Sequence, residues 1–119
     1  MRYYSGEHLW IDAEENMATI GICKHFLIRN DSIRYASAGE TGKEIQAGGP
    51  LLSLENDKSI TEFTAPVTGI ITERNAAIID NPALLDSLSE EECWICKITL
   101  KNEDFSPLMT FEDYESFTS

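Results

Sequence analysis

The chain has 119 residues, 42% of them hydrophobic, and its 21 acidic and 9 basic residues give a formal net charge of -12. This length suits a single globular domain, which at this size buries roughly two thirds of the surface of its unfolded chain. The acidic balance argues against nucleic acid and anionic membranes as partners, because both are bound through clustered lysine and arginine, and it favours partners with basic docking patches.

The cysteine content, and residues 1–8 without the pattern of a signal peptide, favour a reducing compartment. No apolar run reaches the roughly 18 residues that a membrane-spanning helix needs, and residues 1–8 lack the apolar core of a signal peptide. The three cysteines, Cys23, Cys93 and Cys96, form no even disulfide framework. We therefore expect a cytoplasmic monomer, and a processed mitochondrial form is compatible with the same residues.

The N-terminal part of the chain alternates short apolar runs with polar turns. Residues 8–11 and 17–22 have the pattern of two strands joined by an acidic turn, which predicts a hairpin. Residues 23–28 predict a short helical turn that ends at the Asn-Asp pair 30–31. Residues 33–35 predict one short strand before a glycine-containing loop.

Two apolar runs then flank an acidic turn that holds one lysine. Residues 50–54 follow a turn signal of two glycines and a proline, and residues 60–63 form the second run. The turn between them contains Asn56 and Asp57, residue types that favour a tight reversal. The pattern predicts a hairpin that displays Lys58 to solvent at its tip.

The second half continues with short strands, turns and helices. A turn at 65–69 precedes a predicted strand at 70–72, and residues 94–100 form a longer apolar strand. Asn81 followed by Pro82 predicts the start of a short helix, with the asparagine as its N-cap. Many short strands separated by Gly and Pro turns predict a mainly β fold, either a small sandwich or a barrel.

The C-terminal residues predict one further helix, within about 104–117. Two helix starts are present, at Ser106-Pro107 and at Thr110, where acidic residues follow in the first turn. Apolar side chains recur at three-residue steps: Leu108, Phe111, Tyr114 and Phe117. This stripe predicts a helix that docks on the domain.

The sequence indicates neither a metal site nor a catalytic grouping. Cys93 and Cys96 have the spacing of a redox or half-zinc motif, but they lie at the start of a predicted strand, where side chains three residues apart face opposite sides. No second such pair exists, so we expect buried, inert thiols. His8 and His25 have no acid, serine or cysteine at a spacing that implies chemistry.

Three chemical roles are open to Lys58. A lysine that acts as a nucleophile or general base must be partly uncharged at neutral pH, whereas the nearby Glu55, Asp57 and Glu62 favour its charged form. Catalysis by this amine is therefore not expected. A solvated turn lysine is the commonest alternative, and the third role is that of acceptor for a covalent arm.

The residues around Lys58 resemble the attachment pattern of lipoyl domains. Glycines and apolar positions lie at the matching offsets: Gly42, Ile45, Leu51, Leu54, Ser59, Ile60, Phe63, Gly69 and Ile71. Longer segments along the whole chain are similar to the glycine cleavage system H protein family: Glu7-His8-Leu9-Trp10, Ala18-Thr19-Ile20-Gly21-Ile22, Ala65-Pro66-Val67-Thr68-Gly69, Pro82-Ala83-Leu84-Leu85, Trp94-Ile95-Cys96-Lys97-Ile98 and Tyr114-Glu115-Ser116-Phe117.

This resemblance implies a fold, a cofactor and a site. The implied fold is a barrel-sandwich hybrid of two small antiparallel sheets with short helices and a C-terminal helix, and the implied domain is one lipoyl carrier over residues 1–119. Lipoate is expected to be covalently attached to Lys58. Glu55, Asp57 and Gly69 are expected to contribute to recognition by the lipoate-attaching enzyme.

The resemblance also implies a function and a set of partners. Members of this family are carriers, not catalysts: they accept an aminomethyl group from the pyridoxal-phosphate-dependent glycine decarboxylase and deliver it to the aminomethyltransferase. The flavoprotein dihydrolipoamide dehydrogenase then reoxidises the carrier. We therefore expect a non-enzymatic subunit of glycine catabolism.

The turn departs from the usual pattern of the family. H proteins commonly have Glu-Ser-Val-Lys, where this chain has Glu55-Asn56-Asp57-Lys58, and an aspartate before the lysine is more typical of lipoyl domains in 2-oxoacid dehydrogenases. An H-like lipoyl relay or a redox-responsive lipoyl carrier serving other enzymes is therefore an alternative. A biotin carrier would share the fold, but its lysine usually lies between methionines. An unmodified interaction domain would need no lysine chemistry.

Overall fold

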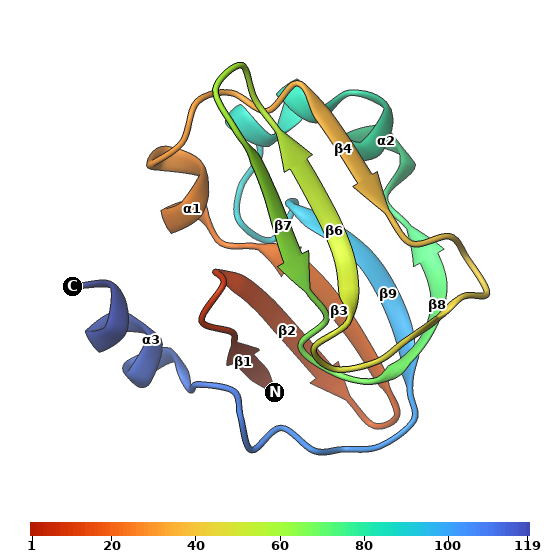
Figure 1. The fold of residues 1–119 in the computed structure, drawn as a ribbon. Helices are drawn as coiled ribbons and strands as arrows, with labels where there is room; N and C mark the ends of the chain where they lie inside the picture. Colours follow the sequence, from red (N-terminus) through yellow and green to blue (C-terminus); the bar gives the residue numbers. More distant parts are fainter.

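The computed structural model describes residues 1–119 and consists of two antiparallel sheets with short helices around them (Figure 1). The larger sheet contains, in spatial order, β1 (Arg2–Tyr4), β2 (Leu9–Glu14), β3 (Met17–Ile22), β9 (Trp94–Leu100), β8 (Gly69–Arg74) and β5 (Glu44–Ile45). The smaller sheet contains β4 (Tyr35–Ala38), β6 (Pro50–Glu55) and β7 (Ile60–Thr64). The helices are α1 (Lys24–Ile28), α2 (Ala76–Asp80), the 3-10 helix η1 (Pro82–Asp86) and α3 (Phe111–Thr118).

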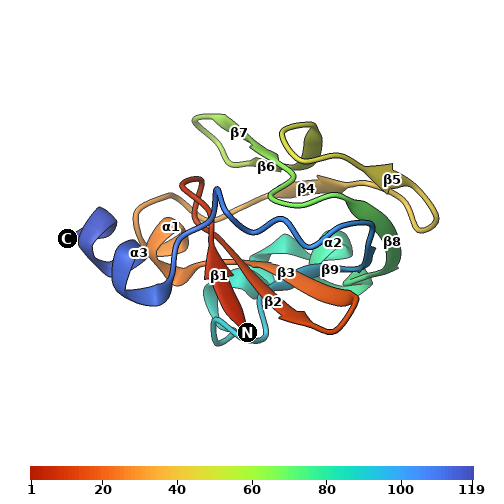
Figure 2. The same ribbon diagram turned by 90° about the horizontal axis from the view of Figure 1, so that it is seen from below.

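The two sheets form layers, and the core lies between them. Figure 2 shows the smaller sheet lying over the larger one. The largest fully buried side chains come from both layers: Phe63, Leu9, Ile11, Ile20, Ile22, Leu54, Ile71, Ile78, Leu85, Ile95, Ile98 and Val67. Phe26 of α1 meets Phe63 of β7 edge-on, with ring centroids 5.2 Å apart. The predicted mainly β architecture of two packed antiparallel sheets is confirmed.

No helix is long and apolar enough to cross a bilayer.

Most strands lie where the hydrophobic pattern predicted them, with shifts at their ends. The strand predicted at 8–11 begins one residue later and continues to Glu14, because His8 adopts a left-handed backbone conformation with φ of 70° that ends strand pairing. Ile33 was predicted to lie in a strand, but it precedes β4 and is buried in the core.

Short elements with weak signals were not predicted. Strand β5 has only two residues, and α2 has five residues with no side-chain cap at either end. The helix predicted to start at Pro82 is present as the 3-10 helix η1, but the side chain of Asn81 makes no capping hydrogen bond. Isolated helices this short have no stability of their own, so tertiary packing decides where they form.

The C-terminal helix begins later than predicted. It starts after Thr110, whose side-chain oxygen accepts a hydrogen bond from the Asp113 N–H at 3.2 Å, so the second of the two predicted starts is used. Residues 104–110 are not helical. In this segment the carboxylate of Asp104 accepts hydrogen bonds from the backbone and hydroxyl of Ser106. Aspartate, like serine, threonine and asparagine, favours such local bonds over helical ones.

One member of the predicted apolar stripe docks α3 on the domain. Tyr114 is buried and stacks on Tyr4 with ring centroids 4.8 Å apart, and its hydroxyl lies 2.8 Å from Nδ1 of His8. Phe111 and Phe117 are 50% and 56% exposed. The helix therefore docks as predicted, with Tyr114 at the centre of the contact face. Phe111 and Phe117 lie at its margins because a three-residue step turns the stripe by about 60°, and they contact Tyr4 and His8 at centroid distances of 6.0 and 6.1 Å.

The turn between β1 and β2 also contacts the free edge of the smaller sheet. One carboxylate oxygen of Glu7 accepts hydrogen bonds from the backbone N–H and the hydroxyl of Thr64, at 2.9 and 2.5 Å. Thr64 is the last residue of β7, which has no strand partner on its outer side. Glu7 and Thr64 therefore link the two layers at the end of β7.

A Gly21→Ala substitution should destabilise the domain by about 1–3 kcal/mol, the usual cost of overpacking a core. A Cβ atom at Gly21 would overlap the indole ring of Trp10, which is only 2% exposed. Urea unfolding measures the loss. Gly6→Ala is the matched control, because a Cβ atom there meets nothing within 4 Å; equal stability of the two variants would contradict the prediction.

The free energy of unfolding should decrease as the pH is lowered, and His8 should account for part of this decrease. Burial, and secondarily the charges of His25 and Arg29, lower the pKa of His8 from its ordinary value of 6.5. The unfolded chain therefore binds the proton more readily, so this contribution to stability is complete above about pH 6.5 and is lost as the pH falls through the lowered folded pKa. Asparagine tolerates the left-handed backbone, so His8→Asn should make the free energy of unfolding depend less on pH below about 6.5. A variant with the same pH dependence as the parent would contradict the role of His8.

Candidate functional site

Strands β6 and β7 form the predicted hairpin, and a four-residue loop joins them. Glu55 pairs with Ile60, which leaves residues 56–59 as the loop. Leu54 and Phe63 of the stem are buried in the core, so the base of the hairpin is fixed. Figure 1 shows the loop projecting at the end of the smaller sheet, far from α3 and both termini.

The side chain of Asn56 organises the loop. Its Oδ1 accepts hydrogen bonds from the backbone N–H groups of Lys58 and Ser59, each at 2.9 Å, and the Asn56 N–H donates to the Ser59 carbonyl at 3.0 Å. This is the local side-chain-to-backbone bonding that makes asparagine a turn residue. It fixes the backbone of Lys58 although nothing encloses the lysine side chain.

Lys58 lies at the tip, with its side chain 80% exposed. Its ammonium group makes one ion pair, with the Asp31 carboxylate at 3.1 Å. Such exposed pairs contribute roughly 0–1 kcal/mol, so the amine is free to leave this partner. An open depression of about 630 Å³ lies beside the tip, and it is lined mostly by polar residues of the loop, of 31–35 and of 80–83.

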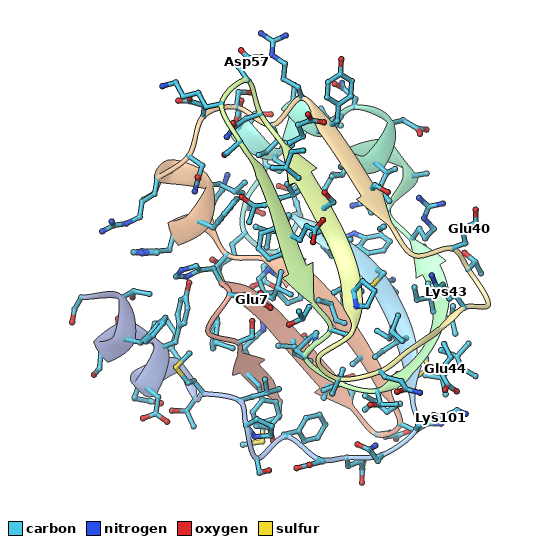
Figure 3. All side chains as sticks on the ribbon, in the orientation of Figure 1. Glu7, Glu40, Lys43, Glu44, Asp57 and Lys101 are labelled. Atoms are coloured by element: carbon cyan, nitrogen blue, oxygen red, sulfur yellow. The ribbon has the colours of Figure 1, made fainter.

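Asp57 and Glu55, the acidic residues next to Lys58, are placed differently. Asp57 lies at the tip of the hairpin (Figure 3) and forms an ion pair with Arg34, with Nε and Oδ1 2.8 Å apart. Glu55 ends β6, and its carbonyl accepts a hydrogen bond from the Arg34 N–H at 2.7 Å. Of the three residues predicted to contribute to recognition, these two border Lys58.

The third predicted recognition residue, Gly69, lies elsewhere. It begins β8 in the larger sheet and pairs with Leu100 and Ile45. Figure 1 shows β7 running away from the loop before the chain turns into β8, so Gly69 lies at the other end of the hairpin from Lys58. A Cβ atom there would overlap the Thr99 carbonyl, and this packing explains the glycine. Its role in recognition stays a prediction.

The three thiols are buried in the core and none forms a disulfide. Burial raises the pKa of Cys23 and Cys96 to about 12, and it also raises the pKa of Cys93. All three groups are therefore protonated thiols at neutral pH, without the thiolate that redox exchange requires. No group of three or more His, Cys, Asp and Glu residues is arranged to hold a metal ion.

Sequence analysis did not connect two residues of another segment to the tip. Asp31 and Arg34 pair with the loop from a segment more than 20 residues away, and no short-range signal connects the two. Asn56 was recognised as a turn residue, but its acceptance of two loop N–H groups was not foreseen. Asp31 and Arg34 have charges opposite to those of Lys58 and Asp57. This complementarity would predict the two ion pairs only once the register of the hairpin is known.

Comparison with known proteins gives one consistent result. The family model described as glycine cleavage H-protein matches residues 2–119. The glycine cleavage system H protein of Acidiphilium cryptum is 30% identical over 115 residues, which cover 96% of this chain and 93% of that protein. That of Dinoroseobacter shibae is 34% identical over 113 residues, covering 94% and 93%. Glycine cleavage system H protein 4 of Aquifex aeolicus is 33% identical over 117 residues, covering 98% of this chain and 68% of that protein.

A solved structure shares the fold. The crystal structure of a glycine cleavage system H protein from Mycobacterium marinum superposes with a TM-score of 0.84 at 24% identity, covering 97% of this chain and 94% of that one. The predicted barrel-sandwich hybrid fold is thereby confirmed. With a family match across almost the whole length, the chain belongs to the glycine cleavage H-protein family.

Proposed function

We propose that this chain is the lipoyl carrier of a glycine cleavage system and that Lys58 is its attachment residue. The observation that carries the proposal is the position of Lys58 in a member of this family: an exposed primary amine on a loop whose backbone Asn56 fixes, at the tip of a hairpin with a buried stem. No other lysine of the chain lies in this loop.

The residues of the tip fit covalent attachment. Nζ of Lys58, once deprotonated, attacks the carboxyl carbon of lipoate activated as an adenylate by the lipoate-attaching enzyme; the C–N amide bond forms, the C–O bond to phosphate breaks, and AMP leaves with the electron pair. The proton lost from nitrogen passes to solvent. When bound, lipoate supplies a disulfide that takes up an aminomethyl group in a redox reaction and is later reoxidised.

The chain's own residues support a carrier better than an enzyme. The tip holds one amine and carboxylates already paired with cations, and it has no histidine, thiol or metal cluster to catalyse a reaction. We infer that the chemistry takes place in the partners: the pyridoxal-phosphate-dependent glycine decarboxylase, the aminomethyltransferase and dihydrolipoamide dehydrogenase. The carrier contributes a fixed starting point for a flexible arm, so the tethered group meets each active site at high effective concentration.

The charge of the chain fits brief encounters with several partners. A formal net charge of -12 favours docking on basic surfaces, and exposed charges on both sides give fast, salt-sensitive association. A carrier that visits successive enzymes needs such exchange, because tight binding to one partner would prevent transfer to the next.

The alternative of a lipoyl carrier for other enzymes is less well supported. The relatives that cover nearly the whole chain are named for the glycine cleavage system. A redox-responsive carrier would need a reactive protein thiol, and the thiols of Cys23, Cys93 and Cys96 are buried with raised pKa values.

Lys58→Arg should abolish lipoylation, because a guanidinium keeps the charge but is not acylated by the attaching enzyme. Intact-mass analysis and peptide mapping of protein from lipoate-replete cells measure the modification. Lys43→Arg is the matched control, because Lys43 is also exposed but lies outside the hairpin loop. An unmodified parent chain, or a modified Lys58→Arg variant, would refute the proposal.

The lipoylated chain should accept an aminomethyl group from glycine in the presence of the decarboxylase. Carbon dioxide release and the mass gained by the carrier report the transfer. Raising the salt from about 0.05 to 0.5 M should increase the KM for the carrier severalfold, because screening weakens attraction between the acidic carrier and a basic partner. A lipoylated chain that gains no mass here, but is reduced by a different lipoyl-dependent complex, would favour the relay instead.

A further inference from the structure

The tip of the hairpin is held from outside by the segment 31–34, here called the brace. Two ion pairs cross between them: Asp31 with Lys58 at 3.1 Å, and Arg34 with Asp57 at 2.8 Å. Each charged residue of the brace thus faces a loop residue of opposite charge. The Arg34 N–H also donates to the Glu55 carbonyl at the end of the stem.

The brace is itself anchored to the domain. Ile33 is 3% exposed and belongs to the core, and the hydroxyl of Ser32 donates to the Asp86 carboxylate in η1 at 2.5 Å. Ile33 therefore fixes the middle of the brace, and its charged neighbours reach the loop from a defined position. A loop that protrudes beyond its sheet gains a restraint that its own residues do not supply.

Acylation of Lys58 affects the two ion pairs unequally. The amide nitrogen that forms is neutral, so the ion pair with Asp31 ends when lipoate is attached. The pair between Arg34 and Asp57 involves no reacting atom and persists. It is therefore the one side-chain ion pair between brace and loop that is present before, during and after attachment.

We propose that Arg34, acting through Asp57, is a positioning residue for the acylation of Lys58. This inference rests on the proposed function, since it presupposes that Lys58 accepts lipoate. The attaching enzyme must hold Nζ in line with an activated carbonyl carbon, and a tip whose motion is already restricted loses less freedom on reaching that geometry. The Arg34 and Asp57 side chains are 62% and 67% exposed, so their pair restricts the tip modestly. Asp57 precedes Lys58 directly in the loop, so its ion pair with Arg34 restrains the residue next to the reacting amine.

The test measures kcat/KM of a lipoate ligase for the purified unmodified chain, with lipoic acid and ATP. Four variants are compared with the parent: Arg34→Ala, Asp57→Ala, the exchange Arg34→Asp with Asp57→Arg, and the control Lys101→Ala. Lys101 pairs with Glu44 on the exposed surface, at the opposite end of the molecule from Asp57 (Figure 3). Thermal melting verifies that each variant is folded.

Arg34→Ala and Asp57→Ala should each lower kcat/KM about fivefold, which corresponds to about 1 kcal/mol, the upper range for an exposed pair. The exchange variant should return to within about twofold of the parent, since it restores an ion pair of reversed polarity. The control should match the parent. Acetylation of Lys58 by a small activated ester needs no defined tip geometry, so Arg34→Ala should leave its rate unchanged.

Three results would overturn the inference. Arg34→Ala could equal the Lys101→Ala control, the exchange could be no better than the single variants, or the acetylation rate of Lys58 could fall in parallel with lipoylation, which would mean that Arg34 changes the amine and not its position. Each leaves lipoylation of the parent, and so the proposed function, intact. A parent chain that takes no lipoate refutes the proposed function and the inference together.

Discussion

Burial of the inner face of the β6–β7 hairpin is the constraint on which the site depends. Leu54 and Phe63 pack into the core between the two sheets, and a strand pair fixed on that face cannot slip by one residue without turning its apolar side chains to solvent. The register in turn determines which four residues form the loop. The core thus places one amine outside the sheet in a defined direction, without any enclosing pocket.

The sequence was sufficient for those parts of the fold that rest on local pattern. The run from Trp94 to Leu100 and the hairpin around Lys58 were predictable, because apolar residues between strong turn signals leave few alternatives. Helix α2 was not predictable, since five residues without capping side chains form a helix only where neighbouring elements pack against them. The late start of α3 has a local cause: the Asp104 carboxylate accepts hydrogen bonds from Ser106 and so competes with helical bonding.

For the site, the sequence singled out the residue proposed for attachment but not its surroundings. Lys58 was found from spacing, and Asn56 and Asp57 were recognised as turn residues. The partners of the loop, Asp31 and Arg34, lie in a segment that reaches the tip only through the tertiary fold. Gly69 illustrates the converse, because a residue prominent in the sequence pattern is accounted for by close packing at the far end of the hairpin.

The contact between Glu7 and Thr64 has a consequence for how the molecule behaves in a crowded solution. Strand β7 is an edge, and an edge with free backbone donors is a template on which another chain can add a strand. The Glu7 carboxylate accepts the hydrogen bond of the Thr64 N–H at the end of this edge, and it adds a negative charge beside the strand. Self-association along β7 would cover the loop that bears Lys58. By protecting this edge, an acidic residue from the opposite layer keeps the loop that bears Lys58 open to other proteins.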